Sequence, residues 1–324
     1  FDGCRMATCS SDRSIKIFDQ HDSGEWKLAG ELPKTHTASV QKIVWAPPEF
    51  GAVLASAAAD GGICIYQESV ETGTGRKLWR QRHKFSVEQG HVSKDIGFGP
   101  ARGGELSLAF TESNRVSIHA SAQSNHTNWT LKGSYVFSSA KSCECLSWCT
   151  SVFDVPMLLV GAEKDVHICG EKKEEELSGQ PGSSSSESWV LIKSLPQHPA
   201  GVVDVAWGPA LGRPWHLLAT ACEDQKVRVF GLSITASWVI TPDMLERPPP
   251  KAEGKAQVRR VSVLTGHTDV VWRVAWNAKG TLLASTDDRG KVHVWASDDH
   301  GRWKLSEVHQ AGNPRSGATT SGPK

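Results

Sequence analysis

The chain has 324 residues, of which 39% are hydrophobic and 22% are charged, and its formal net charge at pH 7 is +1. This near-neutral balance argues against a nucleic-acid-binding surface, and no apolar run approaches the roughly 18 residues that a membrane helix needs. We therefore expect a soluble globular protein without direct nucleic-acid contacts and without a transmembrane segment.

Six short segments share one pattern: two β-branched residues are separated by one residue of any type and are usually followed by a residue with an aromatic or imidazole ring. Alternation with a period of two predicts a β-strand in each segment. In chain order these strands are expected near residues 15–18, 63–66, 116–119, 166–169, 227–230 and 292–295. A second apolar segment rich in small residues precedes each one, as in LAS at 54–56 and LAS at 283–285. Each pair of segments predicts two neighbouring strands.

Two further strands are expected in each unit. One precedes the small-residue segment in five of the six units and ends at Trp45, Phe98, Trp148, Trp207 or Trp276. The first unit lacks it, and we expect that strand to lie upstream of Phe1. Another follows each unit, at 24–28, 76–79, 128–131, 188–191, 258–264 and 301–305.

Four strands per unit, repeated six times, predict an all-β fold, a six-bladed β-propeller over residues 1–309. Two insertions interrupt the repeat, at 171–188 and 241–257, and both are rich in charge, Ser, Pro or Gly. Such sequences bury too little apolar area to become ordered, so we expect flexible insertions there and a disordered tail at 310–324.

The last unit, GHTDVVWRVAWNAKGTLLASTDDRGKVHVW, resembles the WD-repeat signature. The resemblance implies a buried hydrogen-bond network of a histidine, a hydroxyl residue, an aspartate and a tryptophan. By position these would be His267, Ser285, Asp288 and Trp295. The second unit has His36, Ser56, Asp60 and Tyr66 at the same places, and the fifth has His198, Thr220, Asp224 and Phe230.

Within the WD-repeat proteins, the segments RMATCSSDRSIKIFD at 5–19, PEFGAVLAS at 48–56 and LGRPWHLLA at 211–219 look like the nucleoporin Seh family, the Sec-thirteen homologues. This resemblance implies a propeller held open between its first and last blades, into which a partner inserts a blade of its own by β-augmentation. It also implies that apolar residues of those two blades meet the partner, namely Ile15, Ile17, Phe18, Val292, Val294 and Trp295.

The family's partners are α-helical solenoid proteins. One is a nucleoporin of the Y-shaped scaffold complex of the nuclear pore, and another belongs to the GATOR assembly that regulates TOR signalling. The resemblance thus implies a structural subunit at the nuclear envelope that supports transport of mRNA and protein, with the cytoplasm and the lysosomal or vacuolar surface as a second location. Two alternatives stay open: a Sec-thirteen-type vesicle coat subunit, and a closed-ring WD-repeat adaptor that binds peptides.

No enzyme motif competes with this interpretation, because the sequence contains no GxSxG, GxxxxGK, HExxH or GxGxxG segment. We expect no catalytic residue, no cofactor and no metal. Asp287 and Asp288 precede a turn, and His119, His167 and His293 belong to three different blades, so neither set predicts a reaction centre or an ion site.

Two other residue types need an explanation. The eight cysteines are spread along strand-like segments, which is typical of reduced core thiols in an intracellular protein, and the closely spaced Cys143, Cys145 and Cys149 have no second pair at zinc spacing. Most of the 13 tryptophans recur at strand ends, whereas Trp215, Trp238 and Trp272 do not and are candidates for a binding face.

Overall fold

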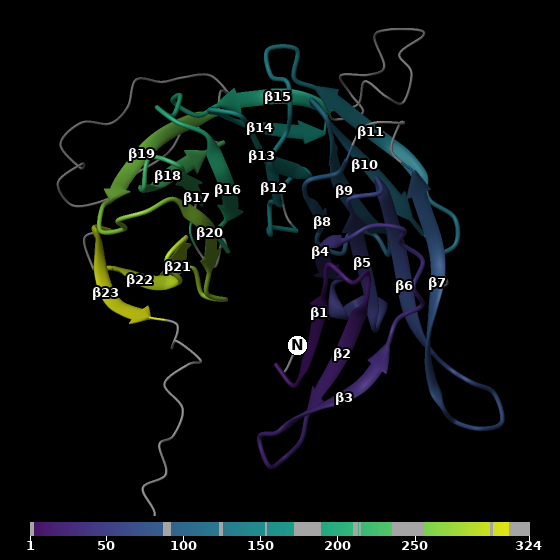
Figure 1. Ribbon diagram of the computed structural model, residues 1–324. Helices are drawn as coiled ribbons and strands as arrows, with labels where there is room; N and C mark the ends of the chain where they lie inside the picture. Colours follow the sequence, from purple (N-terminus) through teal and green to yellow (C-terminus); the bar gives the residue numbers. More distant parts are fainter. Residues whose placement is uncertain are drawn as a thin grey trace, which may run out of the picture.

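The computed structural model describes residues 3–86, 92–122, 126–152, 154–171, 189–209, 213, 215–234, 256–298 and 301–310. These residues form six antiparallel sheets that follow one another around a ring (Figure 1), and a single 3-10 turn, Pro48–Phe50, is their only helical segment. Within the described residues no helix is long and apolar enough to cross a membrane. The fold is the expected six-bladed β-propeller.

We number the sheets 1 to 6 in chain order. Sheet 1 has three strands and sheets 2 to 6 have four each. Sheet 1 comprises β1 (Arg5–Cys9), β2 (Ile15–Gln20) and β3 (Trp26–Glu31); sheet 2 comprises β4 (Val40–Trp45), β5 (Val53–Ala58), β6 (Gly62–Val70) and β7 (Lys77–Ser86); sheet 3 comprises β8 (Ile96–Phe98), β9 (Leu106–Glu112), β10 (Arg115–Ser121) and β11 (Thr130–Val136). Sheet 4 comprises β12 (Cys145–Trp148), β13 (Met157–Ala162), β14 (Asp165–Glu171) and β15 (Trp189–Ser194); sheet 5 comprises β16 (Val202–Trp207), β17 (His216–Cys222), β18 (Val227–Ser233) and β19 (Gln257–Leu264); sheet 6 comprises β20 (Val271–Trp276), β21 (Leu282–Asp287), β22 (Lys291–Ser297) and β23 (Trp303–Gln310).

The repeated sequence pattern produces the same register in every sheet. In sheet 5, Leu218 pairs with Phe230 and Ala219 pairs with Val229, so large side chains lie on one face and smaller ones on the other. The corresponding pairs in sheet 6 are Leu283 with Trp295 and Ala284 with Val294, and in sheet 1 they are Met6 with Phe18 and Ala7 with Ile17. In each of the six sheets the pairing of the third strand with the fourth shifts by one residue. The shift comes immediately before the position that the repeat usually fills with a ring-bearing side chain, such as Phe18 or Trp295. A bulge of this kind increases the local twist, which suits the shape of a propeller blade.

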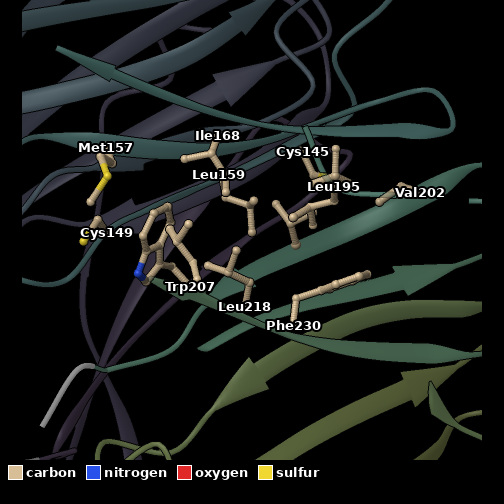
Figure 2. Packing of buried hydrophobic residues seen from close by; sticks show 13 residues of the cluster. Cys145, Cys149, Met157, Leu159, Ile168, Leu195, Val202, Trp207, Leu218 and Phe230 are labelled. Atoms are coloured by element: carbon tan, nitrogen blue, oxygen red, sulfur yellow. The ribbon is translucent and has the colours of Figure 1, made fainter. Parts of the chain in front are cut away.

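The hydrophobic core lies between neighbouring sheets. Five clusters of buried residues join sheets 1 and 2, 2 and 3, 3 and 4, 4 and 5, and 5 and 6. Figure 2 shows the cluster between sheets 4 and 5, in which Leu159, Ile168 and Trp207 pack together. Among the described residues no such cluster joins sheet 6 to sheet 1, and these two sheets stand apart on either side of the N-terminus in Figure 1.

The tryptophans at strand ends pack within their own sheets. Trp45 and Trp79, Trp148 and Trp189, and Trp276 and Trp303 make edge-to-face pairs with ring centroids 5.2 to 5.8 Å apart. Each pair joins the innermost strand of a sheet to its outermost strand, and such geometry is worth about 0.5–1.5 kcal/mol beyond the burial of area. The recurrence of Trp in the sequence therefore has a packing explanation.

Three expected boundaries move by one residue. Glu171 ends β14, Gln257 begins β19 and Gln310 ends β23, so none of the three belongs to an insertion or to the tail. Gln310 is fixed by a hydrogen bond from its side-chain Nε2 to the backbone oxygen of Arg289, 3.0 Å away. The propeller thus extends to residue 310. Residues 172–188, 241–255 and 311–324, where we expected flexibility, lie outside the described residues.

Candidate functional site

At each of the two ends of the ring, one sheet face has no neighbouring sheet against it among the residues that the structure describes. In sheet 6 the face with Leu283 and Trp295 packs on sheet 5, so the opposite face, with Ala284, Val292 and Val294, is the terminal one. In sheet 1 the face with Ile15 and Ile17 packs on sheet 2. The opposite face carries Met6 and Phe18, which pair across β1 and β2. We call these two surfaces the terminal faces.

Comparison with sheet 5 shows that the terminal face of sheet 6 is less buried than the same face of an interior blade. Val227 and Val229 of sheet 5 are 0% exposed because sheet 6 covers them. Their equivalents by register are Val292 and Val294, and both of these are only partly buried. Leu282, beside them on the same face, is 38% exposed. A row of valines that is core in one blade is therefore accessible in the last blade.

The terminal face of sheet 1 shows the same difference. Met6 is 40% exposed, whereas Leu218 and Leu283, which occupy its place in sheets 5 and 6, are 0% exposed. Phe18 is partly buried, but the equivalent Phe230 is 0% exposed. Apolar side chains that the repeat places in a core in sheet 5 thus lie at the surface at both ends of the ring, which makes these faces the candidate interaction site.

The structure divides the six expected contact residues into two groups. Phe18, Val292 and Val294 belong to the terminal faces and are available to a partner. The expectation is wrong for the other three, since all are at most 2% exposed: Ile15 and Ile17 pack against sheet 2, and Trp295 packs against sheet 5. Met6 and Leu282 were missed by the sequence analysis, although aligning the six units position by position identifies both.

The expected network in sheet 6 forms around His267. Ser285 Oγ lies 2.6 Å from His267 Nε2 and 2.8 Å from Trp295 Nε1, which donates to it. The aspartate of the network is Asp287 and not the expected Asp288: Asp287 Oδ2 lies 2.9 Å from His267 Nδ1. Alternation along β21 explains the correction, because Leu283, Ser285 and Asp287 share the face that packs on sheet 5.

Asp287 is also the residue that organises the turn after β21. Its Oδ1 accepts hydrogen bonds from the backbone amides of Arg289, at 3.1 Å, and Lys291, at 3.0 Å. Burial raises the pKa of Asp287, but the hydrogen bonds from His267 and from these amides outweigh burial and hold the pKa below its usual value. Asp288 lies outside the network and accepts a hydrogen bond from Trp272 Nε1 at 2.9 Å.

Other blades keep only part of this network. In sheet 2, His36 lies 2.7 Å from Ser56 Oγ and 3.3 Å from Asp60 Oδ1. In sheet 5, His198 Nε2 lies 2.9 Å from Thr220 Oγ1, but its buried Nδ1 has no hydrogen-bond partner. Asp224 of that blade instead accepts from Arg228 NH1 at 3.0 Å. The hydrogen bonds of the repeat thus vary, while its apolar packing does not.

Two groups of side chains in the described residues could be taken for metal sites. The first is His267, Asp287 and His293, in which the two imidazole rings stack at 3.8 Å and both nitrogens of His267 already face Asp287 and Ser285. Stacked rings do not aim their lone pairs at a common ion, and burial lowers the pKa of His293. This group has the geometry of the structural network and not of an ion site.

The second group is Cys149, Asp154 and His216, at the end of sheets 4 and 5. Cys149 Sγ lies 4.0 Å from His216 Nδ1, whereas Asp154 Oδ2 lies 3.5 Å from the other ring nitrogen, Nε2. The thiol is buried, which raises its pKa to about 11 and keeps it in the unreactive protonated form. The group therefore has neither the geometry of a single-ion site nor an activated nucleophile.

Of the tryptophans outside the repeat, Trp272 is the exposed one, at 48%, and Trp215 packs against the cluster between sheets 5 and 6. Trp238 lies outside the described residues. Trp272 is on the innermost strand of sheet 6, β20, so the more exposed of the two described tryptophans belongs to the same blade as one of the terminal faces.

Comparisons with known proteins agree with this architecture. The WD domain, G-beta repeat family matches residues 1–19, 189–231 and 258–296. Nucleoporin SEH1 of Bos taurus is 31% identical over 331 residues, covering 99% of this chain and 87% of that protein. Nucleoporin SEH1 of Xenopus tropicalis is 32% identical over 323 residues, with 97% and 84% covered. Nucleoporin SEH1 of Homo sapiens is 31% identical over 331 residues, with 99% and 87% covered.

Proposed function

We propose that this chain, which belongs to the nucleoporin SEH1 family of WD-repeat proteins, is a non-catalytic scaffold subunit of the nuclear pore, in its Y-shaped outer-ring complex. Its partner is an α-helical solenoid nucleoporin that inserts a blade of its own between sheets 6 and 1. The complex then supports nucleocytoplasmic transport of mRNA and protein at the nuclear envelope. The family consists of WD-repeat nucleoporins and not of enzymes.

The observation that carries this proposal is the partial exposure of Met6, Phe18, Val292 and Val294. Their equivalents in sheet 5 are all 0% exposed: Leu218, Phe230, Val227 and Val229. Complete burial of a Val, Met or Phe side chain contributes about 1.5–3 kcal/mol. An inserted blade would cover both terminal faces at once and so recover for sheets 6 and 1 the burial that sheets 2 to 5 already have. A partner that packs on one face alone would recover half of it.

The same faces would serve a helical subunit of the GATOR assembly in TOR signalling, at the lysosomal or vacuolar surface. Because one opening accepts one blade, the two partners exclude each other on a single copy of this chain. Binding of one is then expected to reduce binding of the other in direct competition.

Co-expression with the N-terminal half of the helical nucleoporin tests the proposal. We expect the partner to raise the yield and the thermal midpoint of this chain, since a ligand of the native state stabilises it. Val294→Asp and Phe18→Asp place a charge on the terminal faces and are expected to abolish co-purification. The matched control is Leu191→Asp, because Leu191 is 42% exposed on the outer strand of sheet 4 and faces no opening.

Three results would count against the proposal. Equal recovery of the partner with Val294→Asp and with Leu191→Asp would place the contact elsewhere. Capture of vesicle-coat proteins instead of pore proteins would favour the Sec-thirteen-type alternative. A chain that is monomeric, stable and unaffected by the partner would favour the closed-ring adaptor.

A further inference from the structure

Strand β19 carries the only pair of adjacent arginines in the sequence. The segment reads RRVSV at 259–263, so Ser262 lies three residues after Arg259 and two residues after Arg260. No other serine or threonine of the chain has arginines at both of these places. Two guanidinium groups at fixed places before a hydroxyl suit an enzyme that binds an extended peptide, because each can pair with a carboxylate of that enzyme in bidentate geometry.

The side chains around this hydroxyl lie at the surface. β19 is the outermost strand of sheet 5 and lies on the outside of the ring (Figure 1). Arg259 and Arg260 are exposed, and Val263, which follows the serine, is 38% exposed. Ser262 itself is partly buried. The strand therefore offers two cations and one apolar side chain on either side of a single hydroxyl, which is the kind of charge pattern that kinases use to select a substrate.

The Ser262 side chain lies on the face of sheet 5 that packs against sheet 6. It pairs with Val229, and Val229 belongs to the cluster between these two sheets. A kinase must enclose the serine in its cleft, so β19 has to separate from β18 before the hydroxyl can react. Within β19 only Leu264, the last residue, is buried, whereas every residue of β18 is buried. Separation of the outer strand is thus a local opening that costs less than unfolding of the sheet.

The fold accepts a charged side chain at the place of Ser262. The residue that pairs with the same position of the third strand is Lys193 in sheet 4 and Glu307 in sheet 6, and both are exposed. In sheet 4 that face has a neighbouring sheet against it, as it has in sheet 5. A phosphate adds about −1.5 to −2 units of charge at pH 7. The strand can therefore pair with β18 again after the modification.

We propose that Ser262 is a phosphorylation site for an arginine-directed serine kinase, an enzyme whose substrate cleft has carboxylates for the two preceding arginines. Ser262 Oγ attacks the γ-phosphorus of ATP, the bond from that phosphorus to the bridging oxygen breaks, and ADP leaves. The hydroxyl proton passes to the catalytic aspartate of the kinase. This proposal concerns the outer strand of sheet 5 and does not depend on the partner proposed above for the opening between sheets 6 and 1.

Incubation of the full chain with Mg-ATP and the catalytic subunit of the cAMP-dependent protein kinase tests the proposal. We expect mass spectrometry to find a phosphate on Ser262. Arg260→Gln is expected to lower kcat/KM for this serine at least about tenfold, because a charge-assisted hydrogen bond to the kinase is lost. Arg260 is exposed, so this change is expected to leave the urea midpoint of the chain unaltered.

Ser306 is the matched control within the same molecule. It is exposed on β23, which is the outermost strand of sheet 6, but Trp303 and Lys304 stand three and two residues before it. We expect Ser306 to stay unmodified under conditions in which Ser262 is phosphorylated. The control enzyme is a serine kinase that selects acidic side chains around its serine, and it is expected to leave Ser262 unmodified.

The dependence of the phosphorylation rate on urea shows which opening exposes the serine. Local separation of β19 uncovers little surface, so we expect the rate to change little at urea concentrations well below the unfolding midpoint. A peptide of residues 257–264 corrects for the effect of urea on the kinase and is expected to react faster than the chain. A rate that rises with the slope of global unfolding would overturn Ser262 as a site of the native protein.

Three other results would overturn the proposal. One is an unmodified Ser262 in the chain under conditions in which the peptide is phosphorylated. Another is an equal kcat/KM for the original chain and Arg260→Gln. The third is phosphorylation of Ser306 as fast as that of Ser262. None of these outcomes bears on the co-expression experiment, so a failure here and a failure of the proposed function are distinguishable.

Discussion

Replacing Asp287 by Ala removes the acceptor that holds His267, whereas the same change at the adjacent Asp288 removes a contact at the surface. The Asp287 carboxylate is fully buried and accepts from His267 Nδ1 and from the amides of Arg289 and Lys291. Leaving a buried donor unpaired costs about 1–3 kcal/mol, so with the two amides of the turn we expect Asp287→Ala to cost about 2–4 kcal/mol. The Asp288 carboxylate accepts a hydrogen bond from the exposed Trp272 Nε1. Water can take the place of this acceptor in Asp288→Ala, so we expect the unfolding free energy to fall by less than about 1 kcal/mol.

Urea unfolding of the two variants, followed by tryptophan fluorescence, measures the difference in unfolding free energy. Equal losses, or a larger loss for Asp288→Ala, would refute the assignment of Asp287 to the network. The dependence of the unfolding free energy on pH also has a predicted sign. Because the pKa of Asp287 is lowered in the folded state, its contribution is complete above the ordinary aspartate pKa and is lost as the pH falls below that value.

Three further predictions concern side chains that are buried within or between the sheets. Val229→Asp buries a charge between sheets 5 and 6 and is expected to prevent folding, whereas Val294→Asp, at the equivalent place on a terminal face, is expected to change the urea midpoint of the isolated chain little; similar losses for both would contradict the open face. Burial raises the pKa of Asp204 to about 6, so stability is expected to fall by about 2–3 kcal/mol as the pH rises from about 4 through 6, and Asp204→Asn should remove this slope in urea titrations; an unchanged slope would assign it to another group. Burial raises the pKa of the Cys145 thiol far above its usual value, so we expect mass spectrometry to find the exposed Cys4 alkylated in the native isolated chain and Cys145 unmodified; rapid modification of Cys145 would contradict the packing between sheets 4 and 5.

The sequence predicted the blades well because each blade repeats one alternating pattern. A strand at 227–230 or at 292–295 follows from period-two alternation alone, and the six repeats reinforce one another. The choice between Asp287 and Asp288 was beyond that reasoning. Two adjacent aspartates before a turn fit the repeat pattern equally well in the sequence. Only the register of β21 shows that Asp287, and not Asp288, shares a face with Ser285.

Contact residues were harder to predict than strands for a related reason. Alternation groups Ile15 with Ile17, and separates both from Phe18, but it does not say which group faces the next blade. The packing against sheet 2 decides this, and it depends on the handedness of the ring. Met6 was missed because a lone methionine carries no motif; its exposure is informative only beside the buried leucines at the same register.

Hydrogen exchange of the isolated chain and of its complex with the helical nucleoporin tests the central claim most directly. In the isolated chain we expect the amides of β1, at Arg5–Cys9, and of β22, at Lys291–Ser297, to exchange faster than those of β18, at Val227–Ser233. The complex should slow exchange in β1 and β22 and leave β18 unchanged. Equal protection of all three strands in the isolated chain, with no change on binding, would contradict a propeller that a partner blade completes.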